Sequence, residues 1–233
     1  MKLLIFDTET TGLPQKYAKV HMNDLQLWPE IVQISWFIYD DVSNKIISVN
    51  NHIIKVNNIP SDSTKIHKIT NDMSRNLGKP ITQIIALFKN DWDNSHIIVA
   101  HNKRFDLNII GIESMRIYKK NIFENTGKME YCSMKYGYYK TDLTYLCKYT
   151  KKYKKKNPAL FELHKELFHT VPSNLHNAFI DILVCFRCTF QMIYNTDPLK
   201  CNIFIEMPVR ETKSTTYIDD LEFKHVYNES CGL

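Results

Sequence analysis

The chain has 233 residues, of which 44% are hydrophobic, so it can bury one core and does not have the composition of a disordered chain. Its 30 basic and 25 acidic residues give a net charge of +5, which permits a polyanionic partner without requiring one. No apolar stretch reaches the roughly 18 to 20 residues of a membrane span, and the first nine residues lack the composition of a signal peptide. We therefore expect a soluble intracellular protein of the cytoplasm or nucleus, without a membrane partner.

In chain order, short apolar runs rich in Ile, Val and aromatic residues predict strands at residues 2–7, 31–39, 46–56 and 96–100. A polar connection with a short helix is expected between Pro60 and Pro80. Apolar residues at helical spacing predict helices from Ile81 to about residue 91–94, from Phe105 onward, and over 160–168 and 179–193. Strands followed by alternating helices and strands favour a mixed α/β layer fold.

The six cysteines all lie in the second half of the chain, with no secretory signal before them, which favours a reducing compartment. Cys185 and Cys188 form a C-x-x-C pair, but no second pair or nearby histidine completes a zinc-binding set. The surrounding sequence is typical of a helix. We interpret the pair as two buried helix cysteines.

Two carboxylates end the first predicted strand. Asp7 and Glu9 are two positions apart, so the alternation of a strand sends both to the same face. Two like charges so close are unfavourable in a partly dry site unless a cation neutralises them, and Mg²⁺ and Mn²⁺ prefer such oxygen ligands. A solvated acidic turn is the alternative for this pair taken alone.

A third carboxylate, Asp106, follows the fourth predicted strand. Residues beyond the carboxyl ends of parallel strands gather at one edge of a sheet, so Asp106 can meet Asp7 and Glu9 if the two strands are neighbours. Alternatively, Asp106 is an acid in the first turn of a helix, where the helix dipole favours it.

His176 and Asp181 lie at the start of the long last helix. Five helical positions separate two side chains by roughly 140°, so the pair cannot converge if both residues are helical. We therefore expect His176 in the preceding loop and Asp181 on the first turns, facing a site. Most of the nine histidines, in contrast, are expected to be solvated.

Residues 148–156 interleave lysines with tyrosines, a combination that can pair with phosphates and stack on bases. A solvated basic loop is an equally good interpretation.

Together these segments resemble the DnaQ-like (DEDDh) exonuclease superfamily. Its three motifs are matched, in order, by FDTETTGLP at 6–14, AHNKRFDLNII at 100–110 and HNAFIDILVC at 176–185. The resemblance covers residues 1–195, expected to form the exonuclease domain, and leaves 196–233 as a C-terminal extension of unassigned role. It implies a ribonuclease H-like fold, a central five-stranded mixed sheet flanked by helices.

The resemblance also implies roles for the matched positions. Four acids would hold two Mg²⁺ (or Mn²⁺) ions, namely Asp7, Glu9, Asp106 and Asp181. His176 would be the general base, which an imidazole can serve near neutral pH. Four further residues would contact the terminal nucleotide: Thr10, Leu13, Asn102 and Phe105.

The implied activity is 3′→5′ exonucleolytic hydrolysis of DNA, preferably single-stranded, by a two-metal-ion mechanism that releases 5′-mononucleotides. Its partner would be a single-stranded nucleic acid 3′ end, with a polymerase or a replication or repair complex as a candidate assembly. The motifs do not read the 2′-hydroxyl, so an RNA exonuclease is an alternative. A non-catalytic nucleic-acid-binding or scaffold protein that retains the fold is a second alternative.

Overall fold

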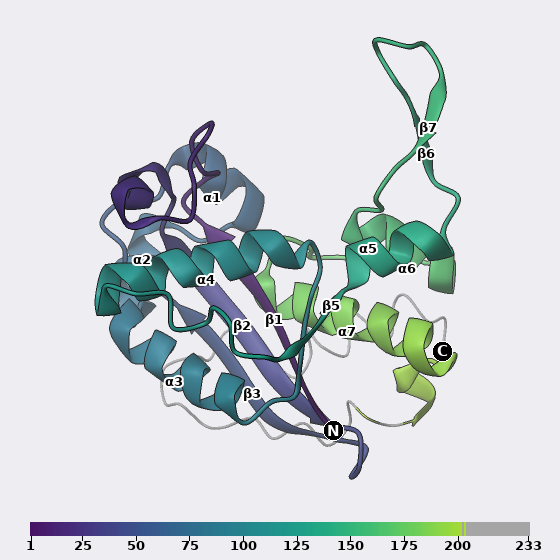
Figure 1. Cartoon of the computed structure of the whole chain (residues 1–233), viewed down its shortest axis with the longest axis horizontal. Helices are drawn as coiled ribbons and strands as arrows, with labels where there is room; N and C mark the ends of the chain where they lie inside the picture. Colours follow the sequence, from purple (N-terminus) through teal and green to yellow (C-terminus); the bar gives the residue numbers. More distant parts are fainter. Residues whose placement is uncertain (202, 204–233) are drawn as a thin grey trace.

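The computed structural model describes residues 1–201 and 203. Its centre is a five-stranded mixed sheet in the order β3-β2-β1-β4-β5 (Figure 1). The strands are β1 Lys2–Thr10, β2 Ile31–Asp40, β3 Lys45–Ile53, β4 Ile97–Ala100 and β5 Met129–Cys132. β1 runs antiparallel to β2 and parallel to β4, so the carboxyl ends of β1 and β4 lie at the same edge. The predicted fold class is confirmed.

Helices cover both faces of the sheet (Figure 1). On one face lie α1 Ser61–His67, α2 Asn71–Leu77, α3 Ile81–Asp93 and α4 Lys103–Tyr118. On the other lie α5 Ser133–Lys140, α6 Leu160–Phe168 and α7 Ala178–Tyr194. Short 3-10 helices occupy Met22–Leu27 and Pro198–Cys201, and a separate hairpin consists of β6 Thr144–Leu146 and β7 Tyr153–Lys155. Within residues 1–201, no helix is long and apolar enough to cross a bilayer.

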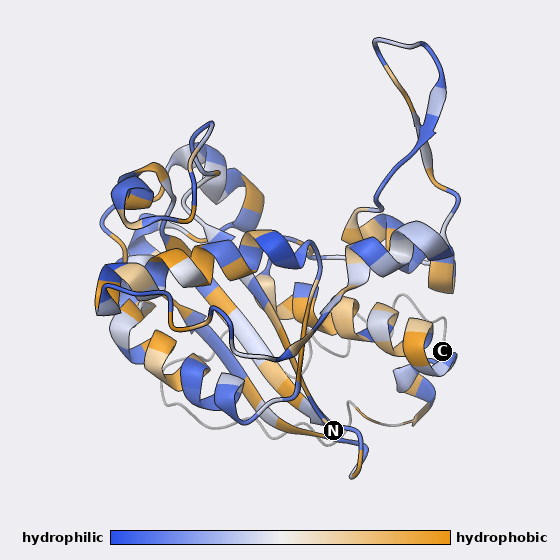
Figure 2. Cartoon of the chain, in the orientation of Figure 1, coloured by the Kyte–Doolittle hydropathy of each residue, from blue (hydrophilic) through white to orange (hydrophobic). Residues whose placement is uncertain are grey.

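The alternation of β1 divides the core in two. Leu4 and Phe6 pack into the cluster shared with α3 and α4, whereas Leu3 and Ile5 pack into the cluster shared with α7. Because both faces are covered, β2 is buried along nearly its whole length, and Figure 2 shows hydrophobic residues along the central strands and α7. The odd-numbered residues of β1 that follow Ile5 therefore face α7, at the edge of the sheet where β1 ends.

Several predicted elements differ from the structure in their limits. β1 continues to Thr10, because its last residues still pair with β2. The stretch between Pro60 and Pro80 forms two short helices instead of one. The helix predicted from Phe105 onward begins at Lys103 and continues through Gly111 to Tyr118. A Cβ atom at Gly111 would lie 2.8 Å from the Asn121 side chain, so glycine permits close packing there. The expected third strand ends three residues early, at Ile53.

Cys185 and Cys188 are buried in α7, which confirms their interpretation. The expectation that most histidines are solvated is wrong for three of them: His52, His67 and His164 are buried. Burial lowers the pKa of His52 and of His164 to about 4. The proposed extension at 196–233 lies almost entirely outside the described residues, so the domain boundary stays a prediction.

Candidate active site

Asp7 and Glu9 lie on the side of β1 that faces α7. They continue the odd-numbered positions whose earlier members, Leu3 and Ile5, pack against that helix. The pairing of β1 with β2 is regular to Glu9, opposite Gln33, and then shifts, so that Thr10 lies opposite Ile31. Such an irregularity bends a strand and redirects its side chains, here at the last carboxylate.

Thr8 lies on the opposite side of β1 and holds Asp106. Its backbone N–H and its hydroxyl both donate to Oδ1 of Asp106, at 3.1 and 2.8 Å. Asp106 is buried one turn into α4, which follows β4, the parallel neighbour of β1. The expected meeting of the two strand ends at one edge is therefore observed.

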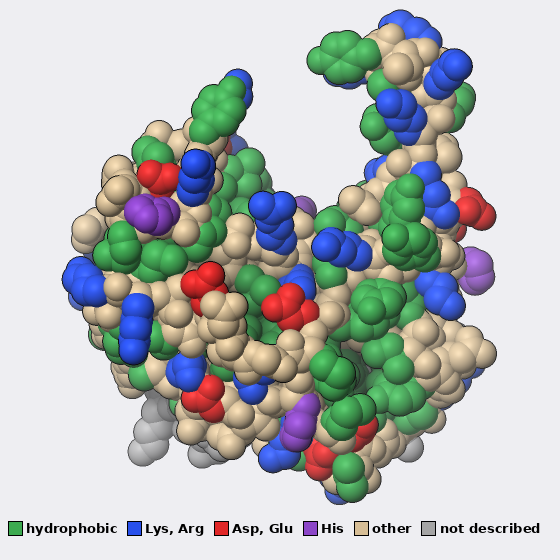
Figure 3. Space-filling model, in the orientation of Figure 1, with side chains coloured by type: hydrophobic (Ala, Val, Ile, Leu, Met, Phe, Trp, Pro, Cys, Tyr) green, Lys and Arg blue, Asp and Glu red, His purple; other side chains and the backbone are tan. Residues whose placement is uncertain are grey.

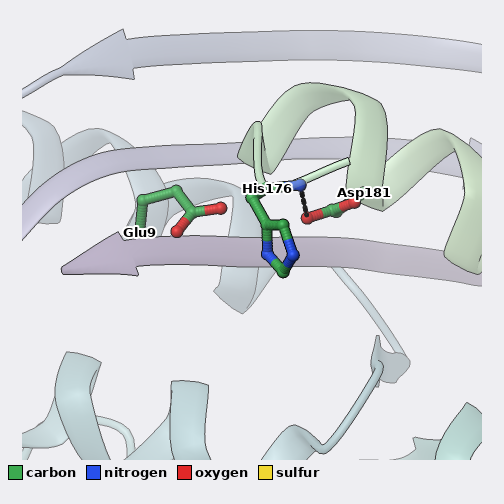
Figure 4. A group of neighbouring side chains, drawn as sticks. All are labelled: Glu9, His176 and Asp181. Carbon is green, nitrogen blue, oxygen red and sulfur yellow. Dashed lines mark hydrogen bonds between the residues drawn. The ribbon is translucent and has the colours of Figure 1, made fainter. Parts of the chain in front are cut away.

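The start of α7 supplies Asp181 and His176. His176 lies in the loop before the helix, with a left-handed φ of 66°, and its backbone N–H donates to Oδ2 of Asp181 at 3.1 Å. Asp181 is buried, whereas the imidazole is exposed and extends from the loop beside Glu9 (Figure 4). Ligand atoms of Glu9, His176 and Asp181 lie within 4.8 Å of one another. The expected placement of His176 and Asp181 matches the structure.

The four carboxylates perturb one another. Burial, followed by the charges of Asp106, Asp181 and Glu9, raises the pKa of Asp7 well above its ordinary value. Burial and the neighbouring acids raise the pKa of Glu9 to about 8. Burial likewise raises the pKa values of Asp106 and Asp181 to about 7, against the hydrogen bonds that each accepts. We call these four residues the acidic cluster: Asp7, Glu9, Asp106 and Asp181.

The acidic cluster fits a divalent cation. Oδ1 of Asp181 is buried and has no hydrogen-bond partner within the described part of the chain, an unfavourable state for a carboxylate oxygen. A cation beside it would satisfy this atom and offset both the burial and the neighbouring charges that raise the pKa values of the cluster. Hard oxygen donors of this kind are the ligands that Mg²⁺ and Mn²⁺ prefer.

The four residues expected to contact a nucleotide lie around this edge in different states. Leu13 is 81% exposed in the loop after β1. The Thr10 hydroxyl is occupied, donating to the carbonyl of Gly12 at 2.7 Å. Asn102 is exposed just before α4 with a φ of 55°, and Phe105 is half-buried against the core. Their roles stay predictions.

Sequence reasoning missed the residues that hold the site together. Gln33 on β2 is buried; its Nε2 donates to Asn51 at 2.8 Å, and its Oε1 accepts from the backbone N–H of Ala178 at 3.2 Å. Asn177 caps α7 by accepting from the N–H of Phe179. These contacts link the sheet to the start of the helix that carries Asp181. A glutamine within a mostly apolar predicted strand was the available signal in the sequence.

His101, in the second motif, has a structural role. Its ring nitrogens lie 2.9 Å from the Ser133 hydroxyl and 3.1 Å from the carbonyl of Pro158, and burial lowers its pKa to about 4. The ring thus joins the end of β4 to the start of α5 and to the segment before α6.

A mixed five-stranded sheet, with acidic side chains gathered where β1 and β4 end, defines a ribonuclease H-like exonuclease domain. The profile of the exonuclease family RNase_T matches residues 4–188, and the chain belongs to this family of nuclease hydrolases. The resemblance to DnaQ-like exonucleases is thereby confirmed.

Among curated proteins, the DNA polymerase III subunit epsilon of Buchnera aphidicola subsp. Acyrthosiphon pisum (strain APS) is 31% identical over 136 residues, which cover 57% of this chain and 51% of that protein. The match therefore spans only about half of this relative.

Solved exonuclease structures share the fold. Exonuclease X in complex with 5′ overhanging duplex DNA has a TM-score of 0.52 at 21% identity, over 83% of this chain and 92% of that one. E. coli exonuclease I in complex with a dT13 oligonucleotide has a TM-score of 0.60 at 15% identity, over 86% of this chain and 42% of that one.

Proposed function

We propose that the chain is a 3′→5′ exonuclease that hydrolyses single-stranded DNA and releases 5′-mononucleotides. The observation that carries this proposal is the convergence of the acidic cluster and His176, which come from β1, α4 and α7, at one edge of the sheet. A scaffold protein that merely retained the fold would gain nothing from four carboxylates, two buried and two half-buried, whose repulsion destabilises it.

In this proposal Asp7, Glu9, Asp106 and Asp181 hold two Mg²⁺ or Mn²⁺ ions. Bound divalent cations supply Lewis-acid activation of water and offset the charge that develops on the phosphate and on the leaving 3′ oxygen. The carboxylates bind only when ionised, so their raised pKa values set a competition between protons and cations.

His176 takes the proton from the attacking water. Its imidazole is exposed and its backbone is fixed by the hydrogen bond to Asp181, so the ring can turn over the scissile phosphate while its point of attachment stays in place. Leu13, exposed on the loop after β1, packs beside the terminal base.

The preference for DNA follows from the relatives: the curated one is named as a DNA polymerase subunit, and both solved structures hold DNA. A polymerase or a repair complex is accordingly the partner class that we propose. The three motifs do not read the 2′-hydroxyl, so RNA is the second candidate substrate.

The test uses the full chain with 5′-labelled single strands of DNA and of RNA with the same sequence, with Mg²⁺, with Mn²⁺ and with a chelator. We expect the labelled DNA to shorten one nucleotide at a time from its 3′ end, with 5′-mononucleotides as the released product and no reaction in chelator. Immediate release of the labelled nucleotide, internal cleavage, or no cleavage with either ion would contradict the proposal. If RNA is shortened faster than DNA, RNA is the preferred substrate.

A further inference from the structure

A β-hairpin projects from the body of the protein between α5 and α6 (Figure 1). We call residues 143–156 the basic hairpin. Its strands pair Thr144 with Lys155 and Leu146 with Tyr153, and the backbone N–H of Cys147 donates to the carbonyl of Lys152 at 3.0 Å to close the turn. Both strands are exposed along their whole length, and neither core cluster includes a residue of the hairpin. The basic hairpin therefore adds nothing to either core cluster.

The basic hairpin carries six lysines and no acidic residue. Two of them anchor its base: Lys155 lies 3.3 Å from Asp142 and over the ring of Tyr138, and Lys156 pairs with Glu162 at 2.7 Å. The other four have no acidic partner within the described residues, namely Lys148, Lys151, Lys152 and Lys154. The outer part of the hairpin thus presents positive charge that a polyanion can neutralise.

Tyrosines alternate with these lysines. Tyr149 is 96% exposed at the turn, Tyr153 is 74% exposed and Tyr145 is also exposed. Removing an exposed aromatic ring from water is favourable, so these tyrosines would gain free energy if another flat surface covered them. Interleaved lysines and exposed aromatic rings match the phosphates and bases of a single strand, since every base has a face that can stack.

The basic hairpin stands at the edge of the molecule where β1 ends. In Figure 3 the hairpin and the loop after β1 rise on either side of a hollow, and Lys and Arg side chains gather on the hairpin. The hairpin grows from α5 and α6, both of which pack on α7, the helix that carries Asp181. A strand whose 3′ end lies in the acidic cluster can therefore pass along the hollow to the hairpin.

We propose that the basic hairpin binds the single strand several nucleotides on the 5′ side of the scissile bond, a proposal that rests on the exonuclease function. The hairpin contains no carboxylate or imidazole, so it acts on binding and retention of the substrate and not on the chemical step. Duplex nucleic acid would use the lysines but leave the tyrosines without bases to stack on.

The experiment measures binding of the full chain to labelled oligo-dT of 3 to 20 nucleotides by fluorescence anisotropy, with Ca²⁺ replacing Mg²⁺ and at several salt concentrations. The test variants are Lys148→Gln, Lys151→Gln and Lys152→Gln combined, and Tyr149→Ala. Their matched controls are Lys89→Gln, Lys119→Gln and Lys120→Gln combined, on α3 and at the end of α4, and Tyr118→Ala.

For the wild type and both controls, affinity should rise with length and then level off. The triple hairpin variant should lose about tenfold on long oligomers and nothing on the trimer, and its salt slope should fall by about 2, since each single-strand phosphate contact contributes about 0.7. Tyr149→Ala should also lose about tenfold on long oligomers, from the lost stacking.

A triple variant with the wild-type slope and length dependence would overturn the proposal, as would equal losses in its control. Wild-type binding to a blunt duplex as tight as to the long single strand would overturn the single-strand assignment. Cleavage of the trimer with Mg²⁺ is assayed separately. If the length effect is present and the trimer is not cleaved, the exonuclease function fails while the hairpin assignment stands.

Discussion

The acidic cluster and the basic hairpin both gather like charges, but they do so in opposite surroundings. The cluster draws its four acids from segments far apart in sequence and withdraws them from water, so each pKa is raised. The hairpin holds six lysines within nine residues and leaves its strands exposed, where water screens their repulsion. Repulsion between like charges therefore destabilises the protein most where packing has removed water, and a bound cation relieves the most repulsion at that place.

The largest difference should appear on removing one charge from the cluster. Asp7→Asn should reduce kcat on a single-stranded oligomer by about three orders of magnitude, because Lewis-acid activation supplies several kcal/mol and about 1.4 kcal/mol corresponds to tenfold. The same change relieves repulsion, so the Tm of the metal-free protein at pH 8 should rise. Asp93→Asn, at the exposed end of α3, is the control and should change neither. An unchanged kcat in Asp7→Asn would remove this residue from the site.

His176→Ala tests the part of the site that lies outside the cluster. Loss of the base should lower kcat by about 10²-fold, whereas calorimetry should show Mn²⁺ and oligomer affinities near those of the wild type. His96→Ala, exposed at the opposite end of β4, should retain full activity. If His176→Ala binds Mn²⁺ or DNA as poorly as it cleaves, the imidazole has a binding role instead.

Gln33→Leu tests the link between the sheet and α7. It leaves the N–H of Ala178 and the side chain of Asn51 short of a partner, which should lower the free energy of unfolding by about 1 to 3 kcal/mol. Because Asp181 loses its positioning, kcat should also fall about 10 to 100-fold with little change in the Kd for long oligomers. The control is Gln83→Leu on the exposed side of α3. Loss of stability with full kcat would leave Gln33 a purely structural residue.

The smallest effect expected is the pH dependence of stability. The pKa values of Glu9, Asp106 and Asp181 rise from about 4 in the unfolded chain to about 7 or 8, so the folded state holds more protons between these pH values. The additional protons stabilise the folded state. Their full contribution to the free energy of unfolding is present below pH 4 and is lost as the pH rises through 7 to 8. The Tm of the metal-free protein should therefore fall from pH 5.5 to pH 8, and Mn²⁺ should raise it more at pH 8. If Mn²⁺ raises the Tm equally at pH 5.5 and at pH 8, the ion does not compete with protons for the cluster carboxylates.

Much of the fold could be predicted because local patterns were strong. The limits of α6, and those of α3 and α7 within about a residue, follow from apolar residues at helical spacing. The residues missed depend on distant partners: the pairing of Glu9 with Gln33 extends β1, and contacts across the core bury His52, His67 and His164. The hairpin was not predicted, because the strands paired between 144–146 and 153–155 show no strong alternation in sequence.

For the site, the sequence by itself predicted which side chains carry the chemistry, since Asp7, Glu9, Asp106, His176 and Asp181 stand in three ordered motifs. It also placed Asp7 and Glu9 on one face, because strand alternation is a local property. Only the tertiary structure decided that β4 is the parallel neighbour of β1, that Thr8 holds Asp106, and that Gln33 fixes the start of α7. Those contacts join residues 98 and 145 positions apart, and it is burial in the finished core that gives the carboxylates their altered pKa values.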